Sequence, residues 1–445
     1  MARPAARKDN SNENRTPDSF RPVYIVDGAR TPFIKARGEP GPFTPVDLAV
    51  QCGRPLLLRQ PIPAQDFDQV ILGCVNVIAE EMNPARVAAL RLGMGVDMTA
   101  FTVQINCGSG MQSIDTAYKY IRSGASDLIL AGGAEALSHA ALLFRQNAVA
   151  WFAALSKSKS LTDKLKTFAT IKPSYFKPVI GLERGLTDPI VDLNMGQTAE
   201  KLAYLFDVSR TEADQYAVTS HMRLARAQEK GFLKGEVETA FASNGAIYEN
   251  DDGVRPDTSI DKLASLSPVF ERPYGKVTAG NSSQITDGAS WVILASEEAV
   301  KKYKLEPLAI IRDSEWSALD PSIMGLGPVL SASSIMTRHG FDLNSIDIWE
   351  INEAFAAQVL ACLKAWEDDE FCRDILSLDG ALGSLDRRKL NIDGGAISLG
   401  HPVGTSGNRI VLHLANALKR LDKKIGIASE CIGGGQGGAM LIERA

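Results

Sequence analysis

The 445-residue sequence predicts an α/β fold made of two similar βαβ-type halves, with a segment of different character between them. Three observations support this prediction. Apolar runs of strand length alternate with stretches of helical periodicity toward both ends of the chain, as in βαβ units. Glycine-rich turns follow corresponding strands in the two halves. Between the halves, over residues 137–268, this alternation stops.

The first half is expected to alternate strands with helices. A short apolar strand over residues 23–26 leads into a turn cluster over 27–32. Residues 128–131 are apolar throughout and precede two glycines, as in a strand covered on both faces. The other expected elements are a strand within 67–77, a helix over 83–92, a strand over 101–105 and a helix over 109–123 that ends at Gly124.

The second half repeats this order. The expected elements are a strand over 346–349, a helix over 353–365, a strand over 390–392, a helix over 408–421 and strands over 425–429 and 439–442. The turn around His401 thus takes the place that the turn around Cys107 has in the first half. Because both turns follow strand ends in a duplicated unit, we expect them to meet at one shared edge.

The middle segment carries an apolar helical pattern and a basic flank. Phe144, Trp151 and Phe152 recur at helical spacing, and the next stretch is rich in lysine. One interpretation is an amphipathic helix packed on the core with a solvated flank. The other is a surface for anionic lipid, a partner chain or an anionic cofactor.

Length and composition bound the class of protein. A chain of 445 residues exceeds one ordinary core, so we expect two or three domains. Apolar residues at 45% and charged residues at 23% are typical of a soluble globular protein, and a net charge of -5 gives no reason to expect nucleic acid. The predicted division is a flexible tail over 1–20, a first half over 21–136 with 269–300, an inserted loop domain over 137–268 and a second half over 301–445.

Cysteine usage and the N-terminal region predict a cytoplasmic location. The six cysteines show no spacing typical of disulfide scaffolds or zinc ribbons, which favours a reducing compartment. Residues 1–20 are polar and contain acids, unlike a signal or transit peptide. No apolar run reaches the roughly 18 residues that a membrane span needs.

Cys107 is the first candidate for chemistry. It stands between an expected strand and an expected helix, where free amides and the helix dipole are expected to lower the pKa of the thiol. Gly108 and Gly110 allow a close backbone approach that a core cysteine does not need. A buried structural cysteine is the alternative.

His401 and Cys431 complete the candidate set. His401 lies between Gly400 and Pro402 in a glycine-framed loop, and its imidazole could take the proton of Cys107. Cys431 precedes a glycine-rich loop whose amides could hold an oxyanion. A tight turn between two strands would explain these glycines but not the cysteine.

With these motifs the chain resembles the thiolase family of acetyl-CoA acyltransferases and acetyltransferases over most of residues 21–445. The resemblance implies the thiolase fold, with a layered αβαβα core. It rests on six motifs in the family's order: Asn106-Cys107-Gly108-Ser109-Gly110, Ala279-Gly280-Asn281-Ser282-Ser283, Asp287-Gly288-Ala289, Asn352-Glu353-Ala354-Phe355-Ala356, Gly400-His401-Pro402 and Cys431-Ile432-Gly433-Gly434-Gly435.

The resemblance also implies residue roles. Cys107 would be the acylated nucleophile, His401 its activating base, and Cys431 the acid or base for the α-proton. Asn352 would hold a water that forms an enolate oxyanion hole with His401, and the amides of Cys107 and Gly433 would hold the acyl-enzyme oxyanion. Ser283 resembles the pantetheine contact, and Arg255 falls where the family contacts the nucleotide end of CoA.

The implied activity is thiolysis of 3-ketoacyl-CoA to acyl-CoA and acetyl-CoA in fatty-acid β-oxidation, or the reverse condensation of acetyl-CoA. CoA would be a substrate, with no permanent cofactor and no metal. A mainly biosynthetic enzyme and a non-catalytic acyl-CoA or lipid carrier are the alternatives, although a carrier is expected to have lost a reactive residue. The expected assembly is a homodimer or homotetramer.

Two segments depart from a short thiolase, namely 140–189 and 367–388. Both resemble the branch that supplies thiolase subunits to fatty-acid-oxidation complexes. They imply a hydratase/dehydrogenase partner chain or contact with a membrane surface as hypotheses.

Overall fold

The computed structural model describes residues 20–445. The predicted flexible tail lies outside this range except for Phe20. One ten-stranded sheet runs in the order β12-β13-β14-β11-β1-β10-β5-β3-β4, with β2 beside β10. Its strands are β1 (Val23–Arg30), β2 (Ile34–Lys35), β3 (Gln69–Gly73), β4 (Thr99–Val103), β5 (Leu128–Ala136), β10 (Thr286–Ser296), β11 (Ala309–Ala318), β12 (Ile348–Ile351), β13 (Ile425–Ile432) and β14 (Gln436–Arg444).

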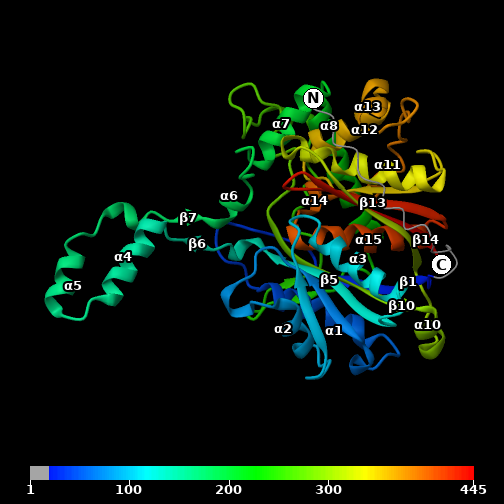
Figure 1. Ribbon diagram of the computed structural model, residues 1–445. Coiled ribbons are helices and arrows are strands. Elements are labelled where there is room, and N and C mark those ends of the chain that lie inside the picture. Colours follow the sequence, from blue (N-terminus) through cyan, green and yellow to red (C-terminus); the bar gives the residue numbers. More distant parts are fainter. Residues whose placement is uncertain (1–19) are drawn as a thin grey trace.

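Helices form three layers around the two halves of this sheet (Figure 1). The middle layer is α3 (Ser109–Arg122) and α15 (Val403–Arg420), and the outer layers include α1 (Pro45–Leu58) and α2 (Pro84–Arg91) on one side, and α11 (Gly327–His339) and α12 (Ala356–Glu367) on the other. The halves join where β1 pairs with β11 over Val23–Ile25. The layered αβαβα architecture expected from the sequence is confirmed.

Each gap between layers holds its own hydrophobic core. The central core joins Ile114 of α3 and Ile410 of α15 to Ile129 of β5 and Ala428 of β13. Two further cores lie between the sheet halves and the outer helices. Every residue of α15 from Val403 to Ala415 is buried, as expected for a helix with sheets on both sides.

The two middle helices approach closely at a glycine. A Cβ atom on Gly110 would lie 2.7 Å from the amide nitrogen of Asn408 and 3.0 Å from the carbonyl oxygen of Gly404. Real Cβ atoms do not come that close to backbone, so the contact requires glycine here. The expectation from the Cys107 motif, that its glycines serve close backbone approach, is met at Gly110.

The duplication is visible in the strand partners. Edge strand β4 precedes Cys107 and α3, and Leu390, which forms a single bridge to β12, precedes His401 and α15. The expected strand over 390–392 is therefore only this bridge.

Several expected boundaries shift. The prediction of a turn over residues 27–32 is wrong for residues 27–30. Strand β1 continues to Arg30, because it pairs with β10 across a bulge near Asp27. Likewise, α12 begins at Ala356 and α15 begins at Val403. Tertiary pairing overrides the local turn preference in β1.

The middle segment divides into a packed part and a projecting arm. Helices α7 (Met195–Leu205) and α8 (Arg210–Lys230) pack on α12 of the second half. The arm is residues 140–181, and its helices α4 (Gln146–Lys157) and α5 (Leu161–Phe168) extend away from the body on the ribbon β6 (Leu142–Leu143) and β7 (Val179–Ile180) (Figure 1). The interpretation of this apolar helix as packed on the core is wrong.

The arm has its own small core. Trp151 of α4 packs edge-on against Phe168 of α5, with ring centroids 5.7 Å apart, and its indole donates to the carbonyl of Thr167 at 2.9 Å. The apolar periodicity was therefore a true helix signal, but its partner is a neighbouring helix of the arm.

The remaining elements are short connections. They are α6 (Gly181–Gly185), β8 (Ala240–Phe241), β9 (Ile247–Tyr248), α9 (Ile260–Ala264), α10 (Glu297–Tyr303), α13 (Asp369–Asp374) and α14 (Ala396–Leu399). Within the described residues, no helix is both long and apolar enough to cross a membrane.

A buried ion network fastens β1 to the middle segment. Arg30 is 1% exposed and donates to Asp251 at 2.7 and 2.9 Å and to Glu236 at 3.1 Å. Glu236 also bonds His413 of α15 at 2.9 Å. Burial opposes charge on His413, but the facing carboxylates raise its pKa to about 10, so it is protonated at neutral pH.

Removing Arg30 should destabilise the fold strongly. Arg30→Met would leave Asp251 and Glu236 with one cationic partner fewer in a dry site, and we expect the free energy of unfolding to fall by about 3–5 kcal/mol. Urea-induced unfolding measures the change. The control Arg373→Met removes the exposed partner of Asp369 and should cost at most about 1 kcal/mol. Equal losses in the two variants would contradict this account of the network.

Candidate active site

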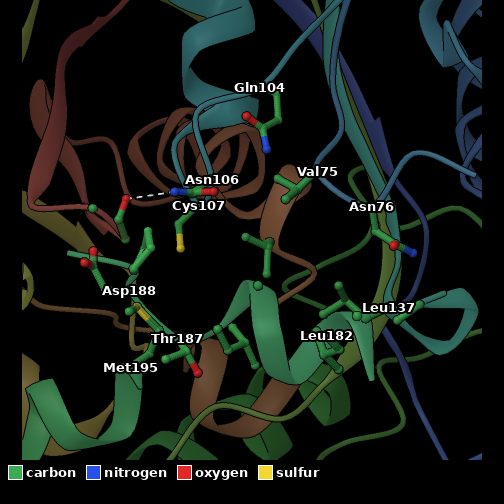
Figure 2. A pocket seen from close by; sticks show the side chains of 18 of the residues that line it. Val75, Asn76, Gln104, Asn106, Cys107, Leu137, Leu182, Thr187, Asp188 and Met195 are labelled. Carbon is green, nitrogen blue, oxygen red and sulfur yellow. Dashed lines mark hydrogen bonds between the residues drawn. The ribbon is translucent and has the colours of Figure 1, made fainter. Parts of the chain in front are cut away.

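Cys107 lies in the loop that leads into α3. The hydroxyl of Ser109 accepts from the amide of Ile105 at 2.9 Å and donates to the carbonyl of Asn106 at 2.7 Å, which closes the loop on itself. Asn106 has a φ of 47° and donates its side-chain amide to the carbonyl of Gly433 at 2.8 Å. The cysteine loop of the first half is thus bonded to the glycine loop of the second half (Figure 2).

His401 is held with one ring nitrogen free. Its backbone amide donates to the carbonyl of Gln284 at 3.0 Å, and its Nδ1 lies 2.6 Å from the hydroxyl of Ser406. That hydroxyl donates to the carbonyl of Pro402 at 3.3 Å, so it accepts the Nδ1 proton. The buried Nε2 has no partner and is left as the base.

The imidazole is neutral at rest. Burial, together with the positive charge of Arg409, lowers the pKa of His401 to about 4. A neutral imidazole can accept a proton at physiological pH, which is what a general base requires.

Asn352 and Cys431 lie on neighbouring strand ends. Asn352 follows β12, is fully buried, and leaves both polar atoms of its side chain without a partner. Buried polar groups are nearly always bonded, so this amide is suited to a water or a substrate oxygen. Cys431 lies near the end of β13 and is 1% exposed; burial, the nearby Cys107 and other neighbours raise the pKa of its thiol well above the usual value.

Ser283 is brought to the same place by chain pairing. Its amide donates to the carbonyl of Ala354 at 2.9 Å, and Ser282 forms a bridge with Phe355. The segment around Ser283 therefore runs between the Asn352 motif and His401, whose amide it also binds through Gln284.

Arg255 is placed on a loop tied to the same region. Its amide donates to Nδ1 of His221 at 3.1 Å, while Gln284 binds the carbonyl of the nearby Gly253 at 2.8 Å. Burial and the adjacent charges of Arg255 and Arg37 lower the pKa of Lys35. Three cations, Lys35, Arg37 and Arg255, therefore lie near one another, with Asp252 paired to Arg37 at 2.9 Å, and the net positive charge favours an anionic group there.

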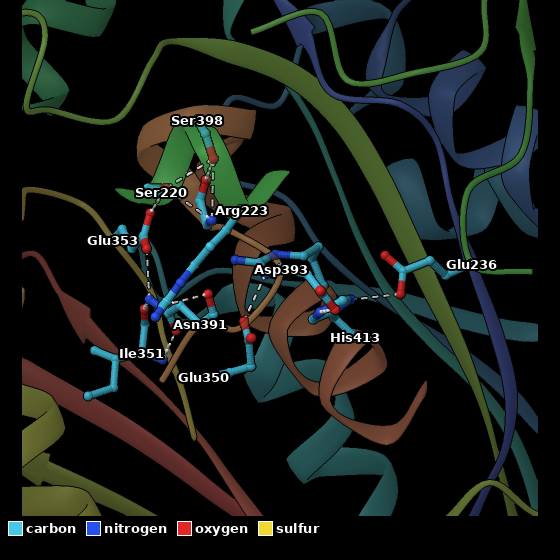
Figure 3. Close-up of polar contacts among 12 residues, drawn as sticks. Ser220, Arg223, Glu236, Glu350, Ile351, Glu353, Asn391, Asp393, Ser398 and His413 are labelled. Atoms are coloured by element: carbon cyan, nitrogen blue, oxygen red, sulfur yellow. Dashed lines mark hydrogen bonds and ion pairs between the residues drawn. The ribbon is translucent and has the colours of Figure 1, made fainter. Parts of the chain in front are cut away.

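Two functional positions were missed in the sequence. Gln284 joins the Arg255 loop to the carbonyls of Ile397 and Ser398, just before His401. Glu353 accepts from Tyr216, Ser220, Asn391 and the amide of Ile397 at 2.6–3.3 Å (Figure 3). Its place directly after Asn352 was the one available signal, because its partners come from remote segments.

The pocket in front of Cys107 has a volume of about 510 Å³. Figure 2 shows Cys107 across the pocket from Leu182 and Met195, and Gly433 and Leu186 also line the pocket. Leu182 belongs to α6, at the base of the arm. His401, Asn352 and Cys431 are buried and do not line this pocket.

The thiol of Cys107 differs from expectation. Burial raises its pKa to about 12, although the Gly433 amide favours the thiolate by hydrogen bonding. The expected lowering of this pKa by the helix N-terminus is wrong, because desolvation of the sulfur outweighs the amides and dipole. The thiol is neutral at rest and must lose its proton during the reaction.

No group of three or more His, Cys, Asp or Glu side chains suited to a metal occurs within residues 20–445. The arrangement combines a partly exposed thiol, a neutral base, a buried amide with free polar atoms and a second protonated thiol. Such a set can form and resolve a thioester while moving one proton.

Comparison with known proteins shows the family of the chain. The family description "Thiolase, N-terminal domain" matches residues 23–298, and "Thiolase, C-terminal domain" matches residues 305–444. The Bos taurus protein named mitochondrial 3-ketoacyl-CoA thiolase is 37% identical over 428 residues, which cover 95% of this chain and 98% of that protein. The Bos taurus mitochondrial trifunctional enzyme subunit beta is 34% identical over 440 residues, covering 99% of this chain and 92% of that protein.

Solved structures agree with these relatives. The crystal structure of human mitochondrial 3-ketoacyl-CoA thiolase in complex with CoA matches with a TM-score of 0.82 and 36% identity, over 96% of this chain and 98% of that chain. The acetyl-CoA acetyltransferase of Bacillus anthracis matches with a TM-score of 0.82 and 33% identity, over 96% of this chain and 99% of that chain.

Alkylation of Cys107 should report its raised pKa. Because the thiol pKa is about 12, the thiolate fraction grows with every step toward alkaline pH. We expect the iodoacetamide rate to rise about tenfold per pH unit from roughly pH 7 to roughly pH 9 without a plateau. Mass spectrometry of the Cys107 peptide follows the adduct, and Cys107→Ala is the control. A plateau near neutral pH would indicate a preformed thiolate instead.

Proposed function

Because this chain belongs to the thiolase family and is an acyltransferase, we propose that it cleaves 3-ketoacyl-CoA with CoA, or condenses acetyl-CoA in reverse, through an acyl thioester on Cys107. One observation carries this proposal. The thiol of Cys107 faces a pocket and accepts a hydrogen bond from the Gly433 amide, and the buried Nε2 of His401 and the buried side-chain amide of Asn352 have no hydrogen-bond partner.

The first half-reaction needs a nucleophile and a proton acceptor. The sulfur of Cys107 attacks the ketone carbon while its proton passes to Nε2 of His401. The amides of Cys107 and Gly433 stabilise the oxyanion that forms. The bond between the α and β carbons then breaks, leaving the acyl group on sulfur and the electron pair on acetyl-CoA.

The leaving enolate needs charge stabilisation and a proton. His401, protonated after the first step, and a water held by Asn352 would stabilise the enolate oxygen. Cys431 would give its proton to the α carbon, a role that suits a thiol held in its protonated form. The thiol of CoA then gives its proton to the Cys431 thiolate and attacks the acyl carbon, and the bond from that carbon to the Cys107 sulfur breaks. The sulfur of Cys107 takes back its proton from His401, so all three groups return to their starting states. The intermediate predicts ping-pong kinetics.

CoA would lie along the segments around Ser283 and Arg255. The cations Lys35, Arg37 and Arg255 supply positive charge for its phosphates, and Ser283 lies beside the Asn352 motif. CoA acts as a substrate and leaves after each turnover.

The pocket favours acyl groups larger than acetyl. Leu182, Leu186 and Met195 give it an apolar wall, and a cavity of about 510 Å³ exceeds the need of two carbons. We propose thiolysis within fatty-acid β-oxidation as the main direction on this ground. A reducing compartment is supported by six free cysteines, and we propose the cytoplasm.

The arm suits a protein partner. Leu142, Phe144, Leu161 and Leu165 are 68%, 52%, 75% and 61% exposed, which is unusual for a surface without a function. One relative is named as a subunit of a trifunctional enzyme. We propose that a hydratase/dehydrogenase chain covers the arm, on a thiolase homodimer or homotetramer; a membrane surface is the competing occupant.

The two cysteines should fail at different steps. Cys107→Ala should form no acyl-enzyme, whereas Cys431→Ala should still be acylated by acyl-CoA but lose thiolysis by at least about a hundredfold. Mass spectrometry of the Cys107 peptide and a thiolysis assay with ketoacyl-CoA measure the two effects. Cys372→Ala, remote from the pocket, is the control. Equal and poor labelling of both variants would overturn the division of roles.

Removing the apolar face of the arm should release the partner. The variant Phe144→Ser with Leu165→Ser keeps the pocket residues, so we expect thiolysis of a short ketoacyl-CoA to stay within about twofold. Size-exclusion chromatography with the hydratase/dehydrogenase chain should show loss of co-elution. If the variant still co-elutes but no longer binds anionic vesicles, a membrane is the occupant and the partner proposal fails.

A further inference from the structure

Glu135 is a buried carboxylate with no role in the chemistry described above. It lies next to the last residue of β5, is 0% exposed, and has no basic side chain among its bonding partners. A carboxylate in such a place is costly unless its oxygens are fully bonded. The groups that donate hydrogen bonds to Glu135 therefore show which segments of the chain it holds in place.

Three backbone amides from two segments donate to Glu135. Val75 and Asn76, after β3, donate at 3.1 and 2.8 Å, and Gly404, in the first turn of α15, donates at 2.9 Å. The first turn of a helix has free amides and partial positive charge, so a carboxylate is favoured there. Burial still raises the pKa of Glu135 to about 7, because desolvation outweighs these three amides.

The segments that Glu135 joins both belong to the active site. Val75 and Asn76 line the pocket beside Cys107, and so does Val403, the first residue of α15 (Figure 2). Gly404 is three residues after His401 in the chain. The fit is close, since a Cβ atom on Gly404 would lie 2.9 Å from the carboxylate and 3.0 Å from Cα of Cys74.

From this placement we propose that Glu135 is a positioning residue for thiolysis, which holds the pocket wall at Val75 and Asn76 in register with the His401 loop. The proposal rests on the proposed function. Glu135 touches no reacting atom; it acts through the two backbone segments whose amides it binds. The two segments come from different halves of the chain, and among residues 20–445 no hydrogen bond joins residues 74–76 directly to residues 401–405.

Asp68, which is exposed, offers a control at the other end of the same strand. Its carboxylate accepts from the amides of Asp127 and Leu128 at 2.6 and 2.9 Å, where β5 begins. It makes the same kind of bond, but neither it nor its partners line the pocket.

Glu135→Gln tests the proposal. The amide nitrogen replaces one acceptor, so at least one of the three donors loses its partner. A small displacement of catalytic groups is costly, and we expect kcat for thiolysis to fall by about tenfold to a hundredfold while KM for CoA stays within about twofold. Asp68→Asn should keep kcat within about twofold. The proposal is overturned if Glu135→Gln keeps wild-type kcat, or if Asp68→Asn lowers kcat equally.

Hydrogen exchange gives a second readout that does not depend on activity. The peptides that contain Val75, Asn76 and Gly404 should exchange faster in Glu135→Gln than in the wild type, and unchanged in Asp68→Asn. An inactive wild type would refute the proposed function alone, and this comparison would still decide the role of Glu135. Unchanged hydrogen exchange in these peptides of Glu135→Gln would refute the positioning role of Glu135. If Glu135→Gln does not fold, Glu135→Asp, whose shorter stem cannot reach both segments, takes its place in both measurements.

Discussion

The close contact of α3 and α15 is the constraint on which the site depends. Each helix begins at a reactive loop, α3 after Cys107 and α15 after His401, and the two helices lie together between the sheet halves. Gly110 permits their backbones to approach, since a Cβ atom there would collide with Asn408 and Gly404. A larger residue would separate the helices and, with them, the nucleophile from its base. The packing of the fold and the geometry of the site therefore both depend on the contact between α3 and α15.

Burial sets the electrostatics of this site. It raises the pKa of Cys107 to about 12 and lowers that of His401 to about 4, so both groups are neutral at rest. In the proposed reaction charge forms only when substrate binds, and it would form beside the Gly433 amide and the unpartnered Asn352 side chain. Dipoles that the fold has already oriented in a water-excluded site need not reorganise when this charge forms, which is the physical advantage of a buried site.

The middle segment connects the pocket to the molecular surface. Its packed helices hold the second half, with Tyr216 and Ser220 of α8 bonded to Glu353 beside Asn352 (Figure 3). Its arm projects with exposed apolar side chains, and Leu182, at the base of the arm, lines the pocket. A chain that binds the arm would therefore contact an element that continues into the substrate site.

Local sequence signals were sufficient for the duplicated strands and helices and for the reactive loops. Apolar periodicity and glycine framing are properties of neighbouring residues, and they identified Cys107, His401 and Cys431, while the order of the motifs indicated the family. They failed where a remote partner decides the outcome. The strand β1 continues through an apparent turn because β10 pairs with it, and the α4 helix projects because its apolar face meets α5.

The sequence by itself identified the candidate reactive groups and their order along two copies of one α/β unit. Only the tertiary structure decided their protonation, since the pKa of a thiol depends on how far water is excluded from it. Only the tertiary structure revealed Glu135, Gln284 and Glu353, because a side chain that binds backbone amides leaves no pattern at its partners' positions. The physical reason is the same in both cases: solvent exclusion and backbone hydrogen bonds depend on residues that lie from 31 to 269 positions apart in the chain.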